Sequence, residues 1–152
     1  MIASNYMRVL CAASLQILSE ALNNVSGFSL ALGTSTLHGM SYLDVRILLT
    51  IKMIVYNFHL LAIPLFDQHA SENMFKVLVK FMDALYSPWR EIPISFFTDG
   101  AWSMTGQTHG LVTRISQCTT GALIRIWCGL HQLDLVMQVF SRHHLTKIFI
   151  PY

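Results

Sequence analysis

The feature that most restricts the fold is a series of three apolar segments between residues 28 and 66, with only short links between them. The segments are residues 28–33, 42–51 and 54–66. In the second segment, Leu43, Val45 and Ile47 alternate with charged residues, which is the period of a strand with one buried face. Pro64 indicates that the third strand ends there or lies at a sheet edge. The series predicts an antiparallel meander of three strands.

The pattern becomes helical after the third segment. Ser71 is a candidate N-cap, Glu72 falls in the first turn, and Pro88 lies beyond the expected end. The apolar residues at helical spacing in this segment are Met74, Leu78, Phe81, Met82 and Leu85. We therefore predict a helix between Ser71 and Pro88 whose methionines belong to the core.

The remaining predicted elements are a helix at 4–22, a strand at 94–98, a helix within 106–118, a strand at 124–128 and a helix at 130–140. Strands that are joined through helices pair in parallel. The predicted fold class is therefore α/β, with a mixed sheet of the three-strand antiparallel meander plus parallel strands, flanked by helices. We divide the chain into an N-terminal helical segment (1–27), a partial main domain (28–140) and a C-terminal tail (141–152).

Composition predicts a single, incomplete domain that leaves part of its apolar surface uncovered. Of the 152 residues, 53% are hydrophobic and only 12% are charged, against roughly 25% charged in an average soluble chain. An incomplete domain that self-associates through exposed apolar surface is therefore expected. Arg46, Lys52 and His59 interrupt the most apolar region, so no membrane span is predicted. The net charge of +2, without any basic run, neither favours nor excludes DNA as a partner.

The cysteine count favours a reducing compartment. Cys11, Cys118 and Cys128 are an odd number and form no disulfide framework. The glycosylation sequon at Asn24 is therefore expected to stay unmodified.

The residues that can carry chemistry follow the two predicted parallel strands. Asp99 comes after the strand at 94–98, and Cys128 and His131 lie where the strand at 124–128 turns into a helix. If these strands are neighbours, their side chains face one crevice. Asp99 precedes a glycine, and Asp-Gly is also a common turn pair. Both interpretations of Asp99 remain open at this point.

Three other constellations are weaker. Cys128 and His131 are half of a zinc site that His143 and His144 are able to complete, but no second ligand pair has zinc-finger spacing. Ser103, Thr105 and His109 lack the nucleophile elbow of a hydrolase. His59 lies among apolar residues and is expected to be a hydrogen-bonded core histidine.

Four segments together resemble the catalytic core of hAT-superfamily transposases. They are residues 57–69, 80–89, 94–115 and 125–138, and the match extends from about residue 28 to residue 138. The most specific part is D-G-A-x-x-M-T-G from Asp99, followed by C-x-x-H-x-L-x-L from Cys128. The resemblance implies a ribonuclease-H-like fold, a nuclear location and an ancestral D-D-E set of carboxylates that bound two Mg²⁺ or Mn²⁺ ions.

This resemblance assigns roles to residues of the chain. Asp99 matches the second carboxylate, whereas Gly33 stands where the first is expected. The third, a glutamate, lies in the family well beyond the C-x-x-H helix, and no residue here matches it. Cys128 and His131 match the C-x-x-H, which in the family packs near the active site.

Two acidic residues are candidate substitutes for the first carboxylate. We do not expect Asp44 to serve, because it lies inside a strand on the Arg46 face, or Asp67, because it follows the third strand toward another rim. The sequence therefore predicts a degenerate transposase-derived fragment without enzymatic activity or a cofactor, Asp99 being a vestigial metal position. The alternative is a domesticated module that associates with DNA or with another protein, including a transposase-like one. An active metal nuclease is least favoured, because it needs carboxylates from another chain.

Overall fold

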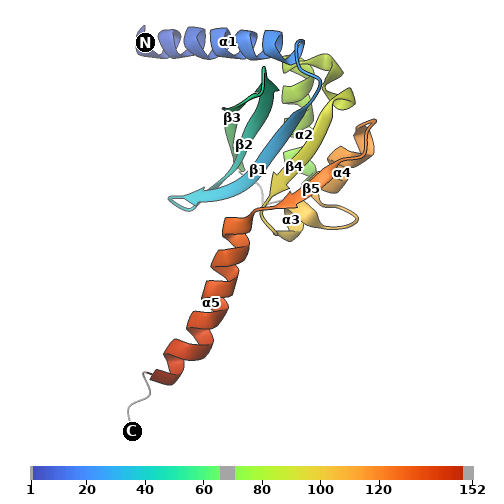
Figure 1. Ribbon diagram of the computed structural model, residues 1–152. Coiled ribbons are helices and arrows are strands. Elements are labelled where there is room, and N and C mark those ends of the chain that lie inside the picture. The colour runs from blue at the N-terminus through green and yellow to red at the C-terminus, as the bar shows by residue number, and fades with distance from the viewer. Residues whose placement is uncertain (1, 66–70, 149–152) are drawn as a thin grey trace.

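The computed structural model describes residues 2–65 and 71–148 (Figure 1). The helices are α1 (Ile2–Leu22), α2 (Ser71–Leu85), the 3₁₀ helix η1 (Ser87–Glu91), α3 (Trp102–Thr105), α4 (Leu111–Cys118) and α5 (Gly129–Ile148). The strands are β1 (Phe28–Leu37), β2 (Met40–Ile51), β3 (Ile54–Leu65), β4 (Pro93–Thr98) and β5 (Ile124–Trp127). In the described part of the chain, no helix combines the length and apolar character that a membrane crossing requires.

The five strands form one mixed sheet in the order β3-β2-β1-β4-β5. β2 pairs antiparallel with both β1 and β3, and β4 lies parallel between β1 and β5. The predicted meander and the predicted parallel strands are therefore confirmed. β1 is longer than predicted and continues to Leu37, where His38 and Gly39 make a two-residue turn with φ of 50° and 78°. Such left-handed pairs match the twist of a hairpin, and this turn fixes the register of β1 against β2.

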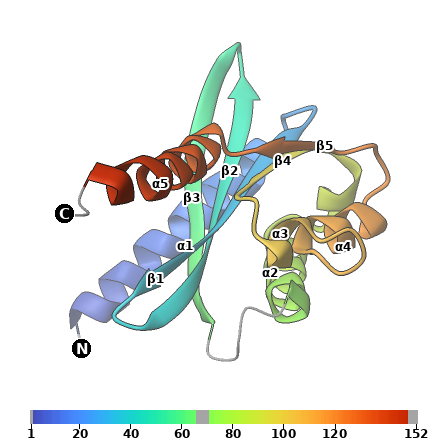
Figure 2. The same ribbon diagram turned by 90° about the horizontal axis from the view of Figure 1, so that it is seen from below.

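The two faces of the sheet differ. Leu43, Val45 and Ile47 are buried. Of the charged residues between them, Asp44 is half-buried and Arg46 is exposed. Figure 2 shows α2, α3 and α4 gathered on one side of the sheet. The buried set belongs to the core under these helices, together with four residues of α2, Met74, Leu78, Met82 and Leu85. The prediction that the methionine stripe belongs to the core is confirmed.

Several local predictions need correction. Ser71 is the first residue of α2, and its hydroxyl donates to the carbonyl oxygen of His109. His59 makes a hydrogen bond, but it is exposed on β3 and is not a core residue. The last helix runs past residue 140 to Ile148. Pairing and packing at a distance decide these features, so local pattern alone does not predict them.

The predicted helix at 106–118 begins only at Leu111, as α4, because a loop that contains Gly106 and Gly110 separates it from α3. The amide of Gly110 donates to the carbonyl oxygen of Gly106 (2.9 Å), and the hydroxyl of Thr113 donates to the same oxygen (2.8 Å). A Cβ atom at Gly110 would lie 2.6 Å from that oxygen and 2.8 Å from the carbonyl oxygen of Met104. The loop closes tightly because neither glycine has a side chain.

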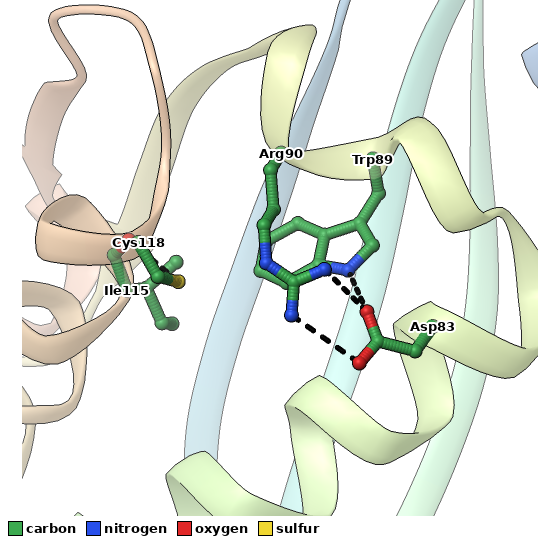
Figure 3. Close-up of polar contacts among 5 residues, drawn as sticks. All are labelled: Asp83, Trp89, Arg90, Ile115 and Cys118. Atoms are coloured by element: carbon green, nitrogen blue, oxygen red, sulfur yellow. Dashed lines mark hydrogen bonds and ion pairs between the residues drawn. The ribbon is translucent and has the colours of Figure 1, made fainter.

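A polar cluster joins α2 to η1 (Figure 3). The indole nitrogen of buried Trp89 donates to Asp83 (2.8 Å), and the guanidinium of Arg90 makes two hydrogen bonds to the same carboxylate (2.5 and 3.2 Å). These hydrogen bonds lower the pKa of Asp83 below its ordinary value, and the bonds from Arg90 have the largest effect. Arg90 also lies 4.7 Å from the centre of the Trp89 ring. The cluster anchors the segment that leads into β4, and therefore the strand that carries Asp99 at its end.

Candidate functional site

A pocket of about 290 Å³ lies on the open face of the sheet, where β1 and β4 run side by side. Leu32 of β1 pairs with Thr98 of β4, so the next residues, Gly33 and Asp99, lie next to each other at the same level. Both line the pocket, and so does Cys128. The amide of Cys128 donates to the carbonyl oxygen of Thr98 (2.9 Å), which holds the end of β5 against the end of β4. The structure thus brings Asp99 and Cys128 into one pocket, as the sequence predicted.

Asp99 is half-buried and participates in its own turn. One of its carboxylate oxygens accepts a hydrogen bond from the amide of Ala101 (3.3 Å). This is the local bond that makes Asp-Gly a common turn pair. The two interpretations of Asp99 are therefore compatible, because the same carboxylate closes the turn and lines the pocket.

Gly33 leaves room in the pocket. A Cβ atom at this position would meet no heavy atom within 4 Å. The antiparallel register places Gly33 opposite Asp44 of β2, which lines the same pocket. Asp44 is held by two cationic or polar groups, because its carboxylate lies 3.3 Å from Nε2 of His59 and 3.9 Å from Nε of Arg46.

Asp44 lies closer to the candidate site than its position in the sequence suggested. Asp44 lies inside a strand and not at a strand end, so the sequence alone predicts that it stays away from the site. The hairpin turn at His38 and Gly39 sets the register that carries it to the pocket. The sequence does contain a signal for this pairing. His38-Gly39 is a candidate two-residue hairpin turn, and Gly33 and Asp44 lie at equal distances along the chain on either side of it, so they face each other in the hairpin.

His131 lies elsewhere. It is half-buried in the first turn of α5, and it is not among the residues that line the pocket with Cys128. Within residues 2–65 and 71–148, no group of three or more potential metal ligands is found. Asp67 and the side chains of His143 and His144 lie outside the described residues. The donors at the pocket are one carboxylate used in a turn, one carboxylate held by Arg46 and His59, and one thiol, a set that does not fit a pair of hard divalent cations.

Thr105 and His109, which the sequence already disfavours as parts of a hydrolase constellation, make hydrogen bonds to the backbone or through it. The hydroxyl of Thr105 donates to the carbonyl oxygen of Ala101 (3.1 Å). The carbonyl oxygen of His109, and not its imidazole, accepts hydrogen bonds from Ser71 and from Arg114. These bonds are structural, because they close loops around α3 and α4.

A second pocket of about 480 Å³ lies on the other side of the β4 end, and it shares Thr98 with the first. Its lining includes two exposed indoles, Trp102, which is 85% exposed, and Trp127. Arg125 of β5 also lines the pocket, and its guanidinium donates to the hydroxyl of Thr113 of α4 (3.1 Å). We call this pocket the tryptophan groove. Sequence reasoning missed it, although each tryptophan lies close in the chain to Asp99 or Cys128.

No family model matches this chain, and no curated protein matches it in sequence. A functional proposal therefore depends on the motifs of the sequence together with the geometry of the two pockets.

Proposed function

We propose that the chain is a degenerate, catalytically inactive fragment of a hAT-type transposase with a ribonuclease-H-like fold. The order of strands and helices supports this, because an antiparallel meander followed by parallel strands joined through helices is the arrangement that the resemblance implies. The position of Asp99 at the end of β4, beside β1 in the centre of the sheet, agrees with a former metal ligand.

One observation carries the proposal. Gly33 lies beside Asp99 on the neighbouring strand, with open space where a side chain would be. A two-metal site needs several anionic oxygen ligands that converge, since Mg²⁺ gives up its water reluctantly. With a glycine at this position, Asp99 lacks the adjacent carboxylate that would share the ions.

Incubation of the purified chain with a duplex oligonucleotide in millimolar Mn²⁺ tests this directly. We expect no nicked product, and we expect any weak Mn²⁺ binding to be unchanged in Asp99→Asn. The control is a commercial nuclease in the same buffer. A nicked product that disappears in Asp99→Asn would contradict the proposal, since it would require an assembled site around this carboxylate.

A second candidate function is a DNA-associating module without chemistry, and the tryptophan groove favours it. Unpaired bases stack on exposed aromatic side chains, and a nearby guanidinium attracts the phosphates and the ring faces. Trp102, Trp127 and Arg125 line one groove and supply these groups. This function needs no metal and is compatible with loss of the ancestral reaction.

Tryptophan fluorescence tests this candidate, because the chain has three tryptophans and Trp89 is buried. Titration with a single-stranded oligothymidine should quench the emission of the exposed pair. Trp102→Ala and Trp127→Ala should each weaken binding by about 1–3 kcal/mol, or roughly 5- to 150-fold. Tyr6→Ala, which removes an exposed aromatic ring on α1, is the matched control. Equal affinity in the wild type and all three variants would exclude the groove as a DNA-binding site.

A further inference from the structure

Arg125 carries a charge that the described part of the chain does not neutralise. It lines the tryptophan groove, and no carboxylate among the described residues forms an ion pair with it. Arg46 and Arg90, in contrast, lie against the carboxylates of Asp44 and Asp83. An unpaired guanidinium beside exposed indole rings favours an anionic ligand, because its planar fork of donors matches the oxygens of a phosphate.

A chain of two hydrogen bonds links this guanidinium to the backbone. Nη2 of Arg125 donates to the hydroxyl of Thr113 (3.1 Å), and that hydroxyl donates to the carbonyl oxygen of Gly106 (2.8 Å). Thr113 is only 7% exposed, and it is not among the residues that line the groove. β5, α4 and the loop before α4 therefore meet at one buried hydroxyl, which holds one N–H group of the guanidinium in place.

This arrangement prepares Arg125 for a ligand. A guanidinium has several N–H donors, and those that do not bond to Thr113 can bind two oxygens of one phosphate. A long side chain normally loses conformational entropy when a ligand immobilises it. Because Thr113 already restrains Arg125, this loss is smaller, and the phosphate binds more tightly.

We propose that Arg125 holds one phosphate of a single DNA strand whose bases stack on Trp102 and Trp127, and that Thr113 positions Arg125. The inference rests on the proposed role of the tryptophan groove in DNA binding, and it adds which part of the ligand the groove must recognise. Thr113 acts only through Arg125, because it is buried and lies outside the groove lining. The groove thus selects an anionic backbone as well as unpaired bases.

Two probes separate recognition of the phosphate from stacking of the bases. They are oligothymidine and the same oligomer with methylphosphonate linkages, whose backbone carries no charge. Fluorescence anisotropy of the labelled probes measures their binding to the whole chain. Arg125→Gln should bind oligothymidine about tenfold more weakly. It should also reduce the steepness of the plot of log affinity against log salt by about 0.7. Binding of the methylphosphonate probe should not change.

Thr113→Val tests the positioning role. It replaces the hydroxyl with a methyl group and should weaken oligothymidine binding about three- to tenfold, because the guanidinium loses its fixed position. Affinity for the methylphosphonate probe should stay the same, which a general disturbance of the fold would not allow. Thr113→Ser keeps the hydroxyl and should retain the affinity. Arg8→Gln is the control for charge, because it removes an exposed guanidinium on α1, far from β5 and α3 (Figure 1).

The results distinguish a failure of this inference from a failure of DNA binding itself. If the wild type binds neither probe, the groove is not a DNA site and both proposals are wrong. If Arg125→Gln weakens both probes equally, or if Arg8→Gln has the same effect on oligothymidine, the phosphate site is wrong, although the groove still binds DNA. Wild-type affinity for oligothymidine in Thr113→Val, or a loss in Thr113→Ser as large as in Thr113→Val, would overturn the positioning role.

Discussion

Replacing Gly33 by aspartate should raise the affinity of the chain for Mn²⁺ about a hundredfold, which corresponds to about 2.7 kcal/mol. The new carboxylate would extend from β1 into the open space beside Asp99, because a Cβ atom at residue 33 meets nothing within 4 Å. Two adjacent carboxylates offer a hard cation converging anionic oxygens, which Asp99 alone does not. Titration followed by calorimetry or by the electron paramagnetic resonance of free Mn²⁺ measures the change.

In the absence of metal, Gly33→Asp should lower the melting temperature of the chain. The introduced carboxylate would place a like charge beside Asp99 and close to Asp44, and Mn²⁺ should restore the lost melting temperature. Gly121→Asp is the matched control, since it adds the same charge at another glycine with open space around it. Adding Asp99→Asn to the Gly33→Asp protein should remove the gain. If Gly121→Asp binds Mn²⁺ as tightly as Gly33→Asp, the pocket has no special role in metal binding.

Replacing Gly110 by alanine should lower the free energy of unfolding by about 3 kcal/mol, which lowers the melting temperature by about 6–12 °C. The added methyl group would lie within 3 Å of backbone carbonyl oxygens of Gly106 and Met104, so the backbone itself must move. This movement would also disturb the hydrogen bonds that Gly106 accepts from Gly110 and Thr113. Thermal and urea unfolding, followed by circular dichroism, give the change.

Gly121→Ala provides the comparison for this prediction. Its methyl group would meet nothing within 4 Å, so its effect should be small, or slightly stabilising because alanine has fewer unfolded conformations than glycine. An equal loss of stability in both variants would mean that the close approach at Gly110 is not the cause.

The sequence predicted those parts of the fold that depend on local period. Alternation in residues 42–51 predicted β2, and the spacing of Met74, Leu78 and Met82 predicted α2 and its buried face. The five-strand mixed sheet followed from the order of these elements. The sequence also predicted that Asp99 and Cys128 lie close together, because each follows one of two strands that pair in parallel.

The features that the sequence did not predict depend on register and on tertiary packing. The position of Asp44 opposite Gly33 requires the exact pairing of β1 and β2, which a left-handed turn sets. The loop between Gly106 and Gly110 replaces helical hydrogen bonds with a closer backbone contact that no periodicity records. The exposed state of His59 and the tryptophan groove result from the edges of the sheet, which only the strand order reveals.

The parallel pairing of β1 with β4 has a consequence for how the chain acquires its structure. β1 and β2 are joined by a two-residue turn and can therefore pair early in folding. In contrast, β1 and β4 are far apart in the sequence: the hydrogen bond between the hydroxyls of Ser29 and Ser95 (2.8 Å) connects residues 66 positions apart. Closing so long a loop is entropically costly, and non-local strand pairing slows folding. The insertion of β4 beside β1 should therefore be the late step, and the pocket at residue 99 comes into existence only when that step is complete.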